Sequence, residues 1–223
     1  MNAAGARALR LGTGLTALAA VAAMYWILHG HDPAADRLRN TVNYFSYFTI
    51  LTNLLVGVAC LAPALRPDGP AGRLFVRPAV RGAVALYVVV MALVYLVLLA
   101  PIYHPQGAQK WVNHVLHRVV PLLYLADWAL LVPRGTLVPR HVMTWLVFPL
   151  LYGGYTLVHG AVSGWYPYPF MAVDRLGYPT VVTNVVGLTA SFLLAGLLLI
   201  GADRMLFRRN APSSGEQARR DPP

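Results

Sequence analysis

The sequence predicts an all-α integral membrane protein, a bundle of six transmembrane helices with both termini in the cytoplasm. Of its 223 residues, 57% are hydrophobic and only 12% are charged, a balance that a soluble domain of this size could not cover with polar surface. Crossing the hydrocarbon takes about 20 apolar residues as a helix. Six runs meet this length, at 8–29, 41–65, 80–100, 111–132, 141–162 and 178–201, within one domain that covers residues 1–209.

Helices are expected rather than a β-barrel, because the runs are continuously apolar and barrel strands would alternate over about ten residues. The first run resembles a signal peptide, with Arg7 and Arg10 before it and small residues at 19–23. It is longer than a usual signal core, and the bulky Tyr25 and Trp26 follow the small residues, so we expect a retained helix. The polar tail, 210–223, has almost nothing to bury and is expected to be disordered.

The net charge of +10 is distributed unevenly between the connections. Thirteen of the 18 Lys and Arg residues precede the first span, follow the last, or lie between spans two and three or four and five. This is the positive-inside pattern, which predicts cytoplasmic termini in a plasma (inner) membrane. The basic residues are therefore expected to bind lipid head groups. No basic domain stands outside the membrane, so no nucleic-acid partner is expected.

Metal chemistry has little support in the sequence. Cys60 is the single cysteine, so no disulfide within the chain and no thiolate metal site is expected. His114 and His117 are three residues apart, and His159 could complete a ligand set. A second shell would need a carboxylate, but Asp127 lies toward the other side of the bilayer. We expect neither a metal nor another cofactor.

Polar side chains gather at one depth in the predicted bundle. Counting about 1.5 Å per residue from the outer ends of the spans places Thr49, His117, Asn184 and His159 in one layer of the outer leaflet. His117 is the first candidate, because an ionisable side chain within a span is costly and therefore a functional candidate. His114, one turn earlier, would support it.

Asp127 lies near the cytoplasmic end of its span. We expect it to pair with a loop arginine such as Arg134 or Arg140. A role in a proton or ion pathway is the functional alternative.

Covalent catalysis without a metal fits these residues. A Thr hydroxyl can attack an ester carbonyl while a nearby imidazole takes its proton. Asn53, four residues after Thr49 on the same helix face, or Asn113 could donate a hydrogen bond to the developing oxyanion. Thr in a membrane helix often only bonds its own backbone, so position alone does not select Thr49. Such a site would act on a substrate that partitions into the bilayer, hence a lipid.

Three short motifs carry a resemblance to a known family: 47–49 (Tyr-Phe-Thr), 113–117 (Asn-His-Val-Leu-His) and 165–167 (Trp-Tyr-Pro). In order and spacing the sequence resembles the androgen-induced and androgen-dependent multi-span membrane hydrolases, and their bacterial six-span branch more closely. The resemblance implies hydrolysis of fatty acid esters of hydroxy fatty acids, with Thr49 as nucleophile and His117 as base. The family's Asn follows its Thr at three residues, whereas Asn53 follows Thr49 at four, which makes Thr52 a rival nucleophile.

Two other classes of function remain open on the sequence. The same polar layer could be the binding site of a non-enzymatic transporter or a small-ligand or lipid carrier, with Asp127 on the path across the membrane. The chain could also be a structural or regulatory membrane protein. A transporter needs polar groups through the whole bilayer, and the cytoplasmic halves of the spans carry few besides Asp127, which favours the enzyme.

Overall fold

The computed structural model describes residues 1–210, which are helical throughout apart from short connections and contain no strand. This confirms the predicted all-α class. The elements in chain order are α1 (Ala3–His29), α2 (Ala34–Phe45), α3 (Phe48–Leu65), α4 (Pro70–Phe75), α5 (Pro78–Val94), η1 (Tyr95–Leu99), α6 (Gly107–His114), η2 (Val115–Val119), α7 (Val120–Leu131), α8 (Arg140–Trp145), α9 (Val147–Ser163), η3 (Pro169–Met171) and α10 (Val173–Asn210). Two of them, η1 and η2, are π-helical turns that continue α5 and join α6 to α7.

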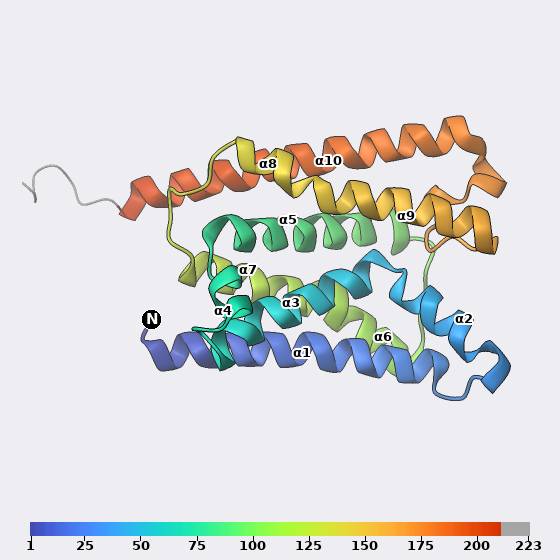
Figure 1. The fold of residues 1–223 in the computed structure, drawn as a ribbon, viewed down its shortest axis with the longest axis horizontal. Helices are drawn as coiled ribbons and strands as arrows, with labels where there is room; N and C mark the ends of the chain where they lie inside the picture. Colours follow the sequence, from blue (N-terminus) through green and yellow to red (C-terminus); the bar gives the residue numbers. More distant parts are fainter. Residues whose placement is uncertain (211–223) are drawn as a thin grey trace, which may run out of the picture.

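The long helices run side by side along the longest axis of the molecule (Figure 1). The N-terminus of α1 and the C-terminal end of α10 lie at the same end, and α2 and the start of α10 lie at the opposite end (Figure 1). The structure therefore consists of antiparallel helical passes that begin and end on one side.

Among residues 1–210, five helices are long and apolar enough to cross a membrane: Ala3–His29, Phe48–Leu65, Pro78–Leu99, Arg140–Ser163 and Val173–Phe207. The predicted span at 111–132 is helical but is not among them; it falls within α6, η2 and α7. His114, His117, Arg118 and Asp127 all lie in that stretch and lower its hydropathy. Of the predicted tail, Asn210 ends α10 and 211–223 fall outside the described residues.

The prediction of one unbroken helix at 41–65 is wrong. The chain turns at Ser46 and Tyr47, and Tyr47 is extended, with φ −77° and ψ 129°. The break leaves N–H groups at the start of α3 without a preceding helical turn. Tyrosine hydroxyls from elsewhere in the bundle accept two of them, which makes the break stable in the protein interior.

Small residues let α1 and α3 approach closely. A Cβ on Gly14 would lie 2.6 Å from a side-chain atom of Leu61, and one on Gly57 would lie 2.5 Å from Leu18. Close packing of this kind is the usual basis of helix association in a membrane, where lipid is as apolar as the side chains. It fixes α3 against α1.

A buried ionic cluster joins α1, α5 and α7. Asp127 forms an ion pair with Arg81, and both side chains are completely buried. Arg10 Nε lies 3.4 Å from the other oxygen of Asp127. Arg81 also donates to the carbonyl of Ala59 at 3.0 Å, and its guanidinium lies 5.0 Å from the ring centroid of Tyr124. The cluster ties three helices and the backbone of α3 together.

The predicted partners of Asp127 are wrong. Arg134 instead pairs with Asp203 at 3.7 Å and donates to the backbone of α7. Arg81 lies at the very start of the predicted span 80–100, next to the basic connection, but α5 already begins at Pro78 and so carries the arginine into the bundle. A carboxylate inside an apolar bundle needs a charged partner, and the nearest are on neighbouring helices rather than in the loop.

Removing the charge of Asp127 should destabilise the bundle. Asp127→Asn leaves Arg81 buried and unpaired, which is expected to lower the free energy of unfolding by about 3–5 kcal/mol. The measurement is unfolding in detergent micelles by titration with dodecyl sulfate. Asp36→Asn, which removes an exposed pair with Arg39, is the matched control and should have little effect. Equal stability of the two variants would contradict the structural role of the cluster.

Candidate active site

The structure brings Thr49 and His117 into direct contact. Thr49 is the second residue of α3, and His117 lies in the π-helical turn η2. The Oγ1 atom of Thr49 is 3.1 Å from Nε2 of His117, although 68 residues separate them in the chain. Thr49 is only 7% exposed and His117 only 8%. This is hydrogen-bond distance for a hydroxyl and an imidazole in a site that excludes bulk water.

The second ring nitrogen of His117 fixes which form of the imidazole faces Thr49. Nδ1 lies 3.0 Å from the carbonyl oxygen of Asn113, which can only accept a hydrogen bond. Nδ1 therefore carries the proton in the neutral ring, and Nε2 is left as an acceptor for the hydroxyl of Thr49. The arrangement resembles a nucleophile, base and orienting group, with a backbone carbonyl in the orienting position.

The ring of Tyr95 packs against one face of the His117 imidazole. The two rings stack, with 3.8 Å between centroids and an interplanar angle of 22°. The Tyr95 hydroxyl accepts a hydrogen bond from the Asn113 side chain at 2.5 Å. Tyr95 begins η1 and His117 lies in η2, so both residues lie in π-helical turns. Such turns are frequent at functional sites because they redirect side chains from the regular helix surface.

Two tyrosine hydroxyls meet the start of α3. Tyr152 accepts from the backbone N–H of Phe48 at 3.1 Å, and Tyr168 accepts from that of Thr49 at 3.4 Å. Tyr168 lies in the segment between α9 and α10, and Tyr152 on α9. The hydroxyl of Thr49 is thus at the positive end of a helix dipole, where a developing negative charge is stabilised. Tyr95 and Tyr152 could not be predicted as site residues, because a tyrosine in an apolar run gives no signal of its contacts. Tyr168 lies in the aromatic and proline-rich loop between the last two predicted spans, where anchoring at the membrane interface was the expectation.

Asn53 and Asn113 each contact the pair through a backbone carbonyl group. The amide of Asn53 donates to the carbonyls of Thr49 at 2.8 Å and Leu116 at 3.4 Å. It links the two elements that carry the pair, but its N–H groups are directed at backbone rather than toward a substrate at Thr49. Asn113 orients His117 through its carbonyl and Tyr95 through its side chain. The Asn53 amide is engaged by two carbonyls and by Sδ of Met91, whereas the Asn113 amide has one partner, Tyr95, and lines a cavity beside the pair. A role for either amide at an oxyanion stays a prediction.

The other predicted supporting residues lie further from the pair. Asn184 donates to the carbonyl of Phe170 at 2.8 Å and so holds the segment before α10. His159 contacts the side chain of Asn43 at 3.1 Å, which links α9 to α2. His114 stacks obliquely with Trp111 and makes no contact with His117 side-chain atoms among the hydrogen bonds of the described residues.

Two cavities adjoin Thr49. One, of about 140 Å³, is lined by apolar residues of α5, α9 and α10. The other, of about 470 Å³, is lined by His117 and by residues of the segment 164–175. Thr49 lines both cavities, whereas Thr52 is fully buried and lines neither of the two. Access to space thus distinguishes the two threonines that the sequence left as rivals.

Within residues 1–210 no group of three His, Cys, Asp or Glu side chains lies close enough together to hold a metal ion. Cys60 is buried next to the ionic cluster rather than near Thr49. No protein-family model, curated protein or solved structure matches the chain.

The tautomer of His117 is directly measurable. In protein with ¹⁵N-labelled histidine, the neutral His117 ring is expected to carry its proton on Nδ1, because that atom faces a carbonyl. Thr49→Val should shift the Nε2 resonance and leave Nδ1 nearly unchanged, since only Nε2 contacts the hydroxyl. The His117→Gln spectrum assigns the signals. A proton on Nε2 in the neutral ring would contradict the arrangement.

Proposed function

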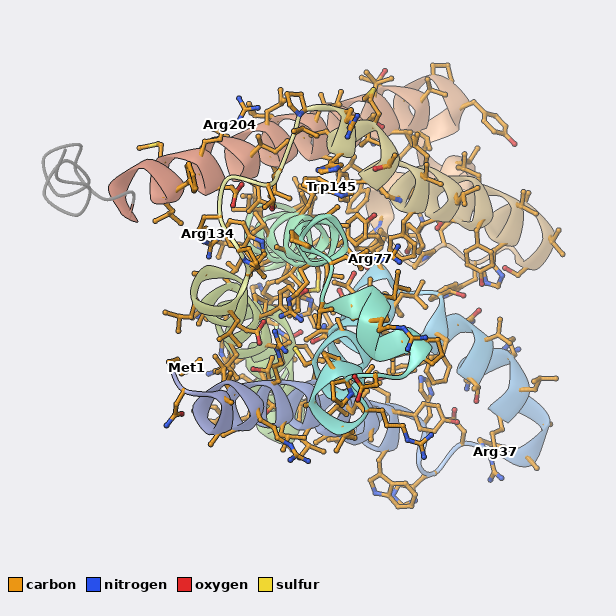
Figure 2. The ribbon with its side chains drawn as sticks, turned by 60° about the vertical axis from the view of Figure 1, so that its left-hand side comes forward. Met1, Arg37, Arg77, Arg134, Trp145 and Arg204 are labelled. Carbon is orange, nitrogen blue, oxygen red and sulfur yellow. The ribbon has the colours of Figure 1, made fainter. Side chains whose placement is uncertain are left out.

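We propose that the chain crosses a plasma (inner) membrane six times, with both termini in the cytoplasm. The five apolar helices and the stretch formed by α6, η2 and α7 would be the spans. Two observations support this topology. Met1 and Arg134 lie toward one end of the bundle and Arg37 toward the other (Figure 2). The end that contains both described chain ends also contains most of the basic connections, as the positive-inside pattern requires.

We further propose that the protein is an intramembrane threonine hydrolase of lipid esters. The observation that carries this proposal is the contact between Thr49 Oγ1 and His117 Nε2, with Nδ1 of the same ring held by a carbonyl. A buried hydroxyl paired with an imidazole in the acceptor form is the arrangement that activates a weak nucleophile. Both residues are those that the resemblance to the androgen-induced and androgen-dependent hydrolases implies.

The proposed reaction has two steps. Thr49 Oγ1 bonds to the carbonyl carbon of the ester while its proton passes to His117 Nε2. The bond to the alcohol oxygen then breaks, the proton moves from His117 to that oxygen, and an acyl ester of Thr49 remains. Water attacks this ester, with His117 taking its proton, and the carboxylic acid and free Thr49 are released. The positive end of the α3 dipole would stabilise the oxyanion of each tetrahedral intermediate, since the first N–H groups of α3 are bonded to other partners.

The structure's charges favour an enzyme over a transporter. Asp127, the carboxylate that a transport path would use, is completely buried and paired with Arg81 and Arg10. Carboxylates in proton or ion pathways need access to the path. A lipid substrate is supported by the apolar cavity at Thr49, whose walls are helices apolar enough to lie in a membrane.

Hydrolysis by purified protein tests the assignment. A panel of fatty acid esters, including esters of hydroxy fatty acids, is assayed with wild type, Thr49→Ala, His117→Ala and Thr52→Ala. Loss of the imidazole is expected to lower kcat/KM by about 10²–10⁴-fold, the usual contribution of a general base. Loss of the hydroxyl removes the nucleophile and is expected to lower kcat/KM at least as much. Thr52→Ala should retain activity, because that side chain reaches neither cavity.

All variants must first elute as folded, monodisperse protein. A folded wild type that cleaves no ester in the panel would contradict the hydrolase and favour a lipid-binding or transport protein. Loss of activity in Thr52→Ala alone would identify Thr52 as the nucleophile.

A further inference from the structure

The two cavities at Thr49 differ in chemistry. The smaller is lined almost entirely by aliphatic and aromatic side chains, among them Val90, Leu150, Leu157 and Phe192. The larger contains most of the polar side chains near the pair, including Tyr47, Tyr103, Asn113 and Arg175. Thr49, Leu99 and Tyr168 line both. The nucleophile therefore lies at the boundary between an apolar and a polar compartment.

The lining of the apolar cavity includes two exposed residues of α9, which is where we place its opening. Leu150 is 50% exposed, and Gly154 is exposed one turn further along the same helix. Both belong to a stretch apolar enough to span a membrane, so this opening faces hydrocarbon in the proposed topology. Gly153 and Gly154 contribute no side chain to the cavity, and a Cβ on either would meet no atom within 4 Å. The two glycines leave free space at the opening.

The polar cavity lies on the other side of Thr49. Residues 164–169, with Asp174 and Arg175, form part of its lining, and Met24 and Ile50 complete the wall toward α1 and α3. Because water and a polar leaving group are more stable here than in the apolar cavity, the compartment suits the alcohol side of an ester.

We propose that the cavity between α5, α9 and α10 holds the methylene groups next to the carbonyl of the ester's fatty acyl chain, and that the far end of the chain extends into the bilayer past Gly154. The alcohol portion occupies the polar cavity beneath residues 164–175. The assignment rests on the proposed hydrolase function for its orientation at Thr49. It follows from the position of the nucleophile, because the carbonyl carbon must lie at Thr49 with its two substituents in the two adjoining spaces.

Photolabelling tests the acyl site without requiring hydrolysis. The probe is a palmitic acid analogue with a diazirine close to its carboxyl group and an alkyne at its methyl end for detection. In wild-type protein in phospholipid nanodiscs, the label should be found by mass spectrometry on cavity residues such as Leu150, Leu157 and Phe192. Gly154→Leu adds a side chain at an exposed position of the cavity lining and should weaken this labelling about tenfold, because it obstructs the path of the methylene groups.

Gly187→Leu is the matched control. Gly187 lies on α10, is exposed, has no atom within 4 Å of an added Cβ and lines neither cavity. It therefore adds the same side chain to a membrane-facing helix without filling the site, and labelling should equal that of wild type. Label on residues of the polar cavity, or labelling that Gly154→Leu leaves unchanged, would overturn the assignment.

Two esters then test the orientation. Gly154→Leu should reduce hydrolysis of an ester with a long acyl chain and a short alcohol, and spare one with a short acyl chain and a long alcohol. The reverse selectivity would overturn the assignment of the two cavities. Specific labelling of a protein that cleaves neither ester would keep the acyl site and reject the hydrolase, so the two failures are distinguishable.

Discussion

The ion pair between Asp127 and Arg81 is the interaction on which the arrangement of the site depends, because hydrocarbon offers no partner to a buried charge. It joins α5 to α7, and Arg10 adds α1. The same helices lead to the candidate active site: α5 continues into η1, which carries Tyr95, and α7 is continuous with η2, which carries His117. The cluster fixes these helices at one end, and the stacked rings of Tyr95 and His117 join them at the other.

Thr49 reaches His117 through a second set of contacts. Close packing of α3 on α1 sets the position of α3, and the hydroxyls of Tyr152 and Tyr168 satisfy its first N–H groups. The interruption between α2 and α3 thus has a chemical consequence. It places Thr49 at the positive end of a helix, next to two cavities, rather than in the middle of a continuous span. Asn53 then bridges α3 to η2, so the hydroxyl and the imidazole are held by side chains of both elements.

The parts of this arrangement that depend on apolar runs and residue type could be predicted from the sequence. The helical class and most of the long helices follow from the apolar runs. The pairing of Thr49 with His117 follows from their matching depth together with the family resemblance. The break at Ser46, the π-helical turns and the partners of Asp127 could not be predicted, because each is decided by side chains distant in the chain. Arg81 illustrates the reason: its charge resembles that of the neighbouring loop arginines, and only the start of α5 at Pro78 carries it into the interior.

The most direct test of whether Thr49 is the nucleophile is a search for its acyl ester. Wild-type protein is mixed with an activated fatty acyl ester, quenched in acid within milliseconds to seconds, digested and examined by mass spectrometry. We expect an acyl group on the peptide that contains Thr49 and none in Thr49→Ala. In His117→Ala the acyl group should form more slowly, because no imidazole takes the hydroxyl proton. Turnover of the ester with no acyl group on Thr49, or with one on Thr52, would contradict the assignment of Thr49 as the nucleophile.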